Sequence, residues 1–415
     1  MNSTGRASLA IERPSKTMTK YIKPFIIIVG LSAYLAGCEQ ASKDQKEPIA
    51  DEEIAKLRLQ FAPDKRVALF QVASRNEGSK VVLTGETNIP EAKAALLDSL
   101  KDHGLTVTDS IELLPSSALE GKIYGLVNNS VANIRSDPRH SGELATQALL
   151  GTPLNVLKQS GEWYLVQTPD KYISWVDHGG LVVLDKAGFE TWKSAEKIIY
   201  TRVAGFSYIA GSETAQPVSD LAMGCVLELV GEEKDFYQVK YPDGREAFVN
   251  KKEAKPVEGW LAQANPTGDN LTNIAFQLMG APYLWGGTST KGMDCSGFTK
   301  TVYFMNGLVI PRDASQQVHA GQPVQSEQPF DQLEVGDLLF FGTPATPEKN
   351  ERVVHVGMWI GDKKFIHASG QVRVSSVDPG NELYDEYNVN RFLRARRYAP
   401  NFEGSILEMK NEVLF

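Results

Sequence analysis

An internal repeat constrains the fold of this chain more than any other feature of its sequence. Eight positions between residues 151 and 176 recur 73 residues further on, seven of them unchanged and the eighth as an aromatic exchange. The first set is Gly151, Leu154, Tyr164, Val166, Pro169, Asp170, Trp175 and Val176, and the second is Gly224, Leu227, Tyr237, Val239, Pro242, Asp243, Phe248 and Val249. Similarity at a fixed spacing indicates a duplicated structural unit. Each copy shows short alternating strands and Pro-Asp turn signals, so we expect two small β-domains, over 119–190 and 191–264.

Length and composition place these two units in a larger protein. A chain of 415 residues exceeds one typical domain, and 42% hydrophobic residues allow several cores. The net charge of −8 argues against a nucleic-acid partner. Three cysteines cannot build a disulfide framework. Cys225, in a predicted strand, is expected to be structural.

A chemical signal lies around Cys295. Asp294 is a good helix N-cap, and Phe298, Val302 and Met305 follow at helical spacing. Cys295 is therefore expected in the first turn of a helix, where the peptide dipoles and free N–H groups favour the nucleophilic thiolate. The alternative is a small buried hydrophobic residue.

Two histidines supply a base for this nucleophile. The segment 353–368 reads as a β-hairpin that turns at 361–363. An odd number of connecting residues places His355 and His367 on one face, with His367 opposite Gly357 and within about 7–8 Å of His355. Cys295, His355 and His367 then follow one another in the chain as nucleophile, base and orienting residue. The alternative is a pair of hydrogen-bonded structural histidines.

Residues 271–398 resemble the NlpC-type cell-wall cysteine peptidases. Six motifs occur in the order of that family, at 280–287, 294–298, 311–317, 333–341, 355–361 and 365–369. The resemblance implies a papain-like α+β domain over 265–400, in which the helix of Cys295 packs on an antiparallel sheet with His355 and His367. It also implies hydrolysis of peptidoglycan stem peptides. Residues 401–415 are expected to be a C-terminal tail.

The two repeated units resemble bacterial SH3-like barrels, which serve as spacers or as wall-binding units. The first begins near the run 131–138.

Residues 54–118 predict a small α+β module with no visible chemistry. Strands are expected at 66–72, 80–84 and 105–114. A helix is expected at 90–103, with an inner face of Ala94, Leu97 and Leu100. The predicted fold class is therefore α+β multidomain, with this module and two barrels before the peptidase domain.

The N-terminus reads as a targeting segment. Lys20 and Lys23 precede the apolar run 25–34, which is too short to span a bilayer, and a small-residue stretch leads to Cys38. The segment 1–38 resembles a bacterial lipoprotein signal, whose cysteine is lipidated; an ordinary secretory signal is the alternative.

This resemblance implies a membrane-anchored, periplasm-facing protein of the bacterial cell envelope. Met18 is an alternative start, because residues 1–17 add nothing to the signal. Residues 39–53 are polar and charged, as expected of a flexible tether.

The complete order of domains resembles the γ-D-glutamyl-L-diamino acid endopeptidases. In that branch the first barrel closes one end of the cleft, and stem peptides with a free N-terminal L-Ala are accepted. The resemblance implies that Glu143 and Asp294 bind the ammonium of this L-Ala. Two carboxylates around one ammonium are a strong anchor. The resemblance also implies that Tyr172 walls the pocket and that the substrate backbone is held by Tyr283, Ser296 and Ser315. A solvated Glu143 and a barrel-core Tyr172 are the alternatives.

The predicted reaction is nucleophilic attack by Cys295 on the γ-carbonyl of D-Glu. His355 protonates the leaving amine, His367 orients His355, and backbone N–H groups at the helix start stabilise the oxyanion. Arg312 and Asp313 are expected to form a structural ion pair; a catalytic role is the alternative. No metal or cofactor is required, and a monomer is expected.

Two other functions remain open, a hydrolase of the intact wall and a non-catalytic wall-binding lipoprotein. The choice between diaminopimelate and Lys is also open.

Overall fold

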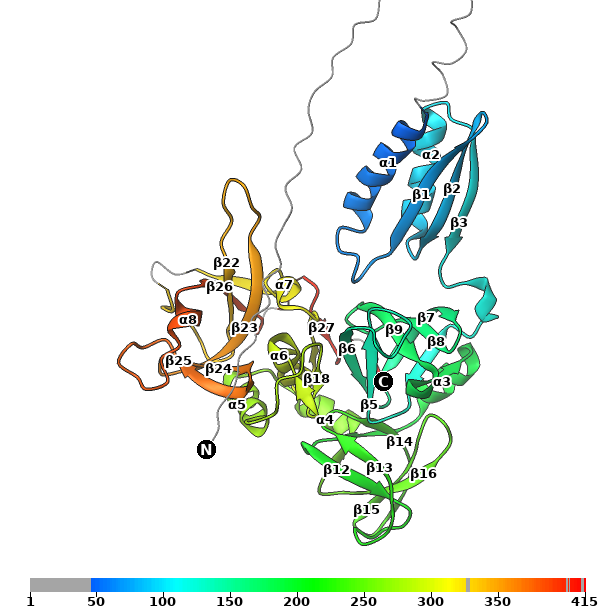
Figure 1. Ribbon diagram of the computed structural model, residues 1–415. Helices are drawn as coiled ribbons and strands as arrows, with labels where there is room; N and C mark the ends of the chain where they lie inside the picture. The colour runs from blue at the N-terminus through cyan, green and yellow to red at the C-terminus, as the bar shows by residue number, and fades with distance from the viewer. Residues whose placement is uncertain (1–45, 326–328, 401, 403, 412–413) are drawn as a thin grey trace, which may run out of the picture.

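The computed structural model describes residues 46–325, 329–400, 402, 404–411 and 414–415 (Figure 1). The predicted signal segment and Cys38 lie outside these residues. No helix within the described part is long and apolar enough to cross a membrane.

The N-terminal module is a three-stranded sheet with two helices. Its elements are α1 (Lys46–Phe61), β1 (Phe70–Glu77), β2 (Lys80–Thr87), α2 (Pro90–Asp102) and β3 (Val107–Leu113), followed by the 3-10 turn η1 (Ser117–Leu119). Strand β2 pairs antiparallel with β1 and parallel with β3. One core holds both helices against the sheet, so the predicted α+β module is confirmed (Figure 1).

Two details of this module differ from the prediction. Helix α1 already begins at Lys46, and Ala50 is fully buried, so residues 46–53 belong to the folded module and not to a tether. The other side chains of residues 48–53 are exposed or half-buried, in keeping with the polar composition of this stretch. The inner face of α2 is Ala92, Leu96 and Leu100, at four-residue spacing, whereas Ala94 is exposed.

The repeat corresponds to two seven-stranded β-domains. The first has the order β10-β4-β7-β8-β9-β5-β6 and the second β13-β12-β16-β15-β14-β11-β17. The first is built from β4 (Tyr124–Val127), β5 (Val131–Arg135), β6 (Leu144–Leu149), β7 (Pro153–Ser160), β8 (Trp163–Gln167), β9 (Ile173–Asp177), η2 (His178–Gly180) and β10 (Leu181–Leu184), with α3 (Lys186–Ser194) after it. The second is built from β11 (Lys197–Tyr200), β12 (Ala204–Tyr208), β13 (Pro217–Ala222), β14 (Val226–Glu233), β15 (Phe236–Lys240), β16 (Glu246–Asn250) and β17 (Ala254–Pro256).

The repeated residues explain why both copies fold alike. The aliphatic pairs Leu154/Leu227, Val166/Val239 and Val176/Val249 are buried in the two cores. Gly151 and Gly224 both adopt positive φ angles, which glycine tolerates best. Each copy therefore keeps its core and its turn, which confirms the duplication.

The C-terminal domain packs helices against a six-stranded antiparallel sheet, in the order β21-β26-β22-β23-β24-β25. The strands are β21 (Gln322–Val324), β22 (Leu338–Thr343), β23 (Arg352–Gly361), β24 (Lys364–Ser369), β25 (Gln371–Ser376) and β26 (Phe392–Arg397). The helices are α5 (Gly268–Gln277), α6 (Cys295–Phe304), α7 (Ala314–Gln317) and α8 (Glu386–Val389). Helix α4 (Val257–Gln263), before them, packs on β11 and β17 of the second barrel. Helix α6 packs on β23 and β24, as the α+β prediction requires.

Two short strand pairs complete this domain. They are β18 (Thr288–Ser289) with β19 (Gly292–Met293), and β20 (Leu308–Val309) with β27 (Leu407–Glu408). Met409, in the predicted tail, is buried in the main core, so the described part of 401–415 packs onto the domain.

The first barrel contacts both the N-terminal module and the C-terminal domain. Its Leu157, Leu165 and Ile173 form an apolar cluster with Leu69 and Leu114 of the N-terminal module. On its other side, Gln147 exchanges hydrogen bonds with Thr288, and Asp170 pairs with Lys300 of α6 at 2.5 Å. The three parts therefore meet around the start of α6.

Candidate active site

Cys295 is the first residue of α6, as predicted. The Asp294 carboxylate caps the helix by accepting a hydrogen bond from the Gly297 N–H at 2.7 Å. Behind the helix lies the loop of Gly286, which has a φ of +78°. A Cβ at Gly286 would lie 2.0 Å from the Leu144 carbonyl oxygen of the first barrel, so only glycine fits there. The glycine motif before the cysteine thus lets the barrel approach the site.

The hairpin brings both histidines together. Nε2 of His355 lies 2.7 Å from Nδ1 of His367, and Nε2 of His367 lies 3.0 Å from the Ser375 hydroxyl. The turn has two residues, and a bulge after Trp359 supplies the extra residue that the predicted odd connection required. A Cβ at Gly357 would lie 3.2 Å from Cβ of His367, which confirms the predicted facing pair.

Burial keeps the three groups neutral. It raises the pKa of Cys295 to about 12, with a further rise from Asp294, against backbone hydrogen bonds from Val356 and Ser296. Burial also lowers the pKa of His355 well below its usual value, and His367 lowers it further. The pKa of His367 falls to about 4 through burial, although the carboxylate of Asp385 opposes this. Burial therefore opposes the expected resting thiolate, while the hydrogen bonds at the helix start favour it.

A pocket of about 500 Å³ opens at Cys295. Three of the four parts of the protein line it. They are the N-terminal module with Arg66, the first barrel with Ser136, Glu143, Leu144, Ala145 and Tyr172, and the C-terminal domain with residues around 285, 295, 313 and 353. The predicted Asp294, Ser296 and Ser315 lie in this lining. Tyr283 lies outside this lining and is half-buried. Burial raises the pKa of its hydroxyl, and the nearby Cys295 and Asp294 raise it further.

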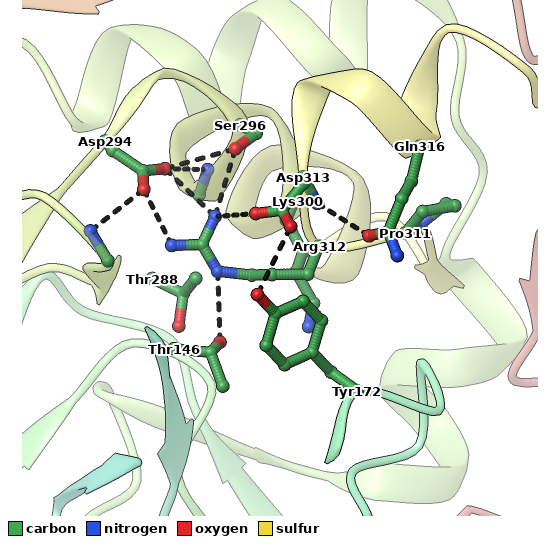
Figure 2. Close-up of polar contacts among 12 residues, drawn as sticks. Thr146, Tyr172, Thr288, Asp294, Ser296, Lys300, Pro311, Arg312, Asp313 and Gln316 are labelled. Atoms are coloured by element: carbon green, nitrogen blue, oxygen red, sulfur yellow. Dashed lines mark hydrogen bonds and ion pairs between the residues drawn. The ribbon is translucent and has the colours of Figure 1, made fainter. Parts of the chain in front are cut away.

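A buried ion pair forms the floor of the pocket (Figure 2). Arg312 donates from Nη2 to Oδ2 of Asp294 at 2.7 Å and from Nη1 to Oδ1 at 3.1 Å. The same carboxylate accepts from the N–H groups of Gly286 and Gly297 and from the Ser296 hydroxyl. The predicted ion pair of Arg312 therefore exists, but Asp294 is its main partner; Asp313 lies 3.9 Å away.

The opposite wall is built around Asp313. Its Oδ2 accepts from the Tyr172 hydroxyl at 3.2 Å and from Nη1 of Arg66 at 2.7 Å. The same nitrogen of Arg66 donates to the Ser315 hydroxyl at 2.9 Å. Tyr172 is thus a wall of the pocket and not merely a ring in the barrel core.

Glu143 lies at the mouth, where its Oε1 accepts from Nε1 of Trp285 at 2.6 Å. Both side chains are solvent-exposed.

Arg66 and Trp285 were missed by the sequence analysis. Trp285 stands in the recognised glycine motif, so its position gave a signal. No such signal existed for Arg66, which is a single arginine in a module without motifs. Within the described residues, no group of three or more His, Cys, Asp or Glu side chains could hold a metal ion.

Comparisons with known proteins match two parts of the chain to family models. Residues 280–397 match the NlpC/P60 family, and residues 134–181 match the bacterial dipeptidyl-peptidase Sh3 domain. A γ-D-glutamyl-L-lysine dipeptidyl-peptidase of Bacillus cereus is 30% identical over 276 residues, covering 63% of this chain and 77% of that protein. The enzyme of the same name from Bacillus subtilis is 33% identical over 228 residues, covering 54% and 72%.

A solved structure shows a related fold. It is an NlpC/P60 family protein from Bacillus cereus, with a TM-score of 0.56 and 28% identity, and the match covers 67% of this chain and all of that one.

The burial of the two histidines predicts their titration. In the folded protein, both imidazoles should stay neutral well below pH 6.5, and His367 should take up its proton only near pH 4. The unfolded chain binds both protons near pH 6.5, so the free energy of unfolding should decrease as the pH falls below that value. NMR titration of the imidazole resonances, with and without urea, measures this. Protonation of both rings near pH 6.5 in the folded protein would show that the site is open to water.

Proposed function

This chain belongs to the NlpC/P60 family, whose members act on cell-wall peptides, and on that premise we propose that it cleaves the γ-D-Glu–L-diamino acid bond of stem peptides with a free N-terminal L-Ala. The observation that carries the proposal is that Cys295 lines a pocket with residues of the first barrel, on a helix packed against the strands that carry the His355–His367 pair. The names of the two Bacillus relatives support the same bond.

The proposed reaction starts from a neutral Cys295 thiol and a neutral His355 imidazole, the forms that burial favours. Cys295 attacks the γ-carbonyl carbon of D-Glu while His355 accepts the thiol proton, so that charge develops only with bond formation. His367 holds the His355 ring through the 2.7 Å contact. His355 then passes the proton to the leaving amine, and a thioester remains. Water, deprotonated by His355, releases the acyl group and restores the thiol.

We propose that backbone N–H groups at the start of α6 stabilise the oxyanion that forms in both steps. The first turn of a helix leaves such groups without intrahelical partners, and the N–H of Cys295 is among them.

The pocket lining holds three carboxylates, Glu143, Asp294 and Asp313, and three arginines, Arg66, Arg312 and the exposed Arg352. Asp294 accepts five hydrogen bonds from the protein, two of them from Arg312, so its charge and its lone pairs are already used. Within the described residues, Glu143 accepts one side-chain hydrogen bond, from Trp285 to Oε1. Asp313 accepts from Arg66 and Tyr172 through Oδ2 and takes part in the capping box of α7, and its Oδ1 lies 3.9 Å from Nη1 of Arg312. We therefore assign the ammonium to Glu143 and Asp313, and give Asp294 the task of holding Arg312 and capping α6.

The predicted contacts of Tyr283, Ser296 and Ser315 with the substrate backbone remain part of the proposal. Ser296 and Ser315 line the pocket with hydroxyl groups that Arg312 and Arg66 already orient. An intact-wall endopeptidase or amidase is the competing activity, and it would require this end of the pocket to admit a sugar-linked stem. A non-catalytic wall-binding lipoprotein is disfavoured by the assembled cysteine and histidines.

Substitution of the reacting groups tests the chemistry. Cys295→Ala and His355→Ala should each reduce kcat by about 10⁴-fold or more, because the pair acts as a unit. His367→Ala should cost less, since it only orients the base. Rates are measured by mass spectrometry of the products, with circular dichroism as a check on folding. Near-normal hydrolysis by Cys295→Ala would remove the nucleophile assignment.

Acetylation of the substrate tests the ammonium site. It removes the positive charge of L-Ala and adds bulk at the closed end, and one lost charge-assisted hydrogen bond is worth about 1.5–3 kcal/mol. With two carboxylates left unpaired, kcat/KM should fall by about 10²-fold or more. Glu143→Gln should weaken cleavage of the free peptide and reduce its advantage over the acetylated one. Equal cleavage of both peptides by the wild-type protein would favour the intact-wall hydrolases.

We also propose that Cys38 carries lipid and anchors the protein in the cell envelope, facing the periplasm. The support is the sequence around Cys38 alone. Radiolabelled fatty acid should enter the wild-type protein but not Cys38→Ala. A mature protein that is cleaved elsewhere and carries no label would instead indicate an ordinary secretory signal.

A further inference from the structure

The N-terminal module reaches into the pocket through one loop. Between α1 and β1, Arg66 is held by its carbonyl oxygen, which accepts from the Ile173 N–H of the first barrel at 2.7 Å. Next to it, the Val67 carbonyl accepts from Nε2 of Gln167 at 3.2 Å, and Leu69 is buried in the apolar cluster. The loop is thus fixed on both sides of the arginine.

The guanidinium group of Arg66 connects two carboxylates. Nε and Nη2 donate to the two oxygens of Asp64 at 2.8 and 2.7 Å, and Nη1 donates to Oδ2 of Asp313. Asp64 is itself tied to α7 by Nε2 of Gln316 at 2.7 Å. Both side chains of the Arg66–Asp64 pair therefore bind the segment that carries Asp313.

Charge balance shows what this arrangement can do. Asp64 neutralises Arg66 through a two-pronged contact, so Arg66 can orient Asp313 without cancelling its charge. On the floor of the pocket, Asp294 and Arg312 neutralise each other in the same way. Asp313 and Glu143 are then the lining carboxylates without a neutralising partner of their own, and Arg352 is an exposed side chain of the same lining.

We propose that the N-terminal module is a working part of the substrate pocket and that Arg66, supported by Asp64, is a positioning residue that aims Asp313 at the N-terminal ammonium of the peptide. The inference rests on the proposed function and extends it. Neither family match includes residues before 134, so the contribution of this module is not part of the matched domains. Within the described residues, Arg66 is the residue of this module that lines the pocket.

Three single variants test this inference on the full chain. Arg66→Ala removes the donor to Asp313, and Arg66→Lys keeps the charge but loses the two-pronged geometry. Lys158→Ala is the control, because Lys158 pairs with Glu86 across the same module boundary at 2.6 Å but lies outside the pocket lining. Each protein is assayed with the free and the acetylated stem peptide, and thermal unfolding checks that it is folded.

Arg66→Ala should raise KM for the free peptide by about tenfold or more, with kcat within about twofold, and should leave the acetylated peptide almost unaffected. Arg66→Lys should recover part of the loss, and Lys158→Ala should behave as wild type. Asp313→Asn combined with Arg66→Ala should be no worse than Asp313→Asn alone, because Arg66 acts through Asp313.

The outcomes separate this inference from the proposed function. If the wild-type protein prefers the free peptide but folded Arg66→Ala keeps that preference, the positioning role is overturned and the proposed function stands. If the wild-type protein cleaves both peptides equally, the proposed function fails first. Additive effects in the double variant would also overturn the inference. Should Arg66→Ala not fold, Arg66→Lys decides: an unchanged KM overturns the role, and a raised KM for the free peptide alone supports it.

Discussion

The buried ion pair of Asp294 and Arg312 is the interaction on which the rest of the site depends. Asp294 caps the helix that begins with Cys295 and binds the Gly286 loop, while Arg312 also reaches Thr146 of the first barrel at 3.1 Å. Removing one partner of such a pair typically costs about 3–5 kcal/mol, because the other charge stays buried. One contact therefore fixes the nucleophile, the glycine loop and the barrel relative to one another (Figure 2).

The same pair determines which charges a ligand meets. A carboxylate beside the nucleophile would favour a bound cation there and would oppose ionisation of the thiol. With Arg312 against Asp294, that charge is compensated, and the uncompensated carboxylates lie at Glu143 and Asp313 instead. In the proposed function these two carboxylates bind the ammonium, and the carboxylate next to Cys295 holds Arg312.

The sequence predicted those features that depend on local pattern. The capped helix of Cys295 and the hairpin of His355 and His367 follow from spacing within a few residues, and both were confirmed. The resting thiolate stays a prediction, since the burial that raises the pKa of the thiol is a property of the assembled fold and not of a helix start. The face of α2 was misplaced because alanines and leucines offer two stripes of helical spacing, and packing against α1 chooses between them.

Arg66 marks the limit of what the sequence could show. Its contact with Asp313 joins residues 247 positions apart, and nothing in the local pattern distinguishes this arginine from a solvated one. The sequence also predicted no chemistry for the module to which Arg66 belongs. Yet Leu69 and Leu114 bury apolar surface against the first barrel, so the module is docked on the barrel and not suspended beside it. A loop fixed by such a contact can hold a charged side chain at a set position, and a flexible one cannot. The part of the chain with the least recognisable sequence therefore completes the wall of the pocket.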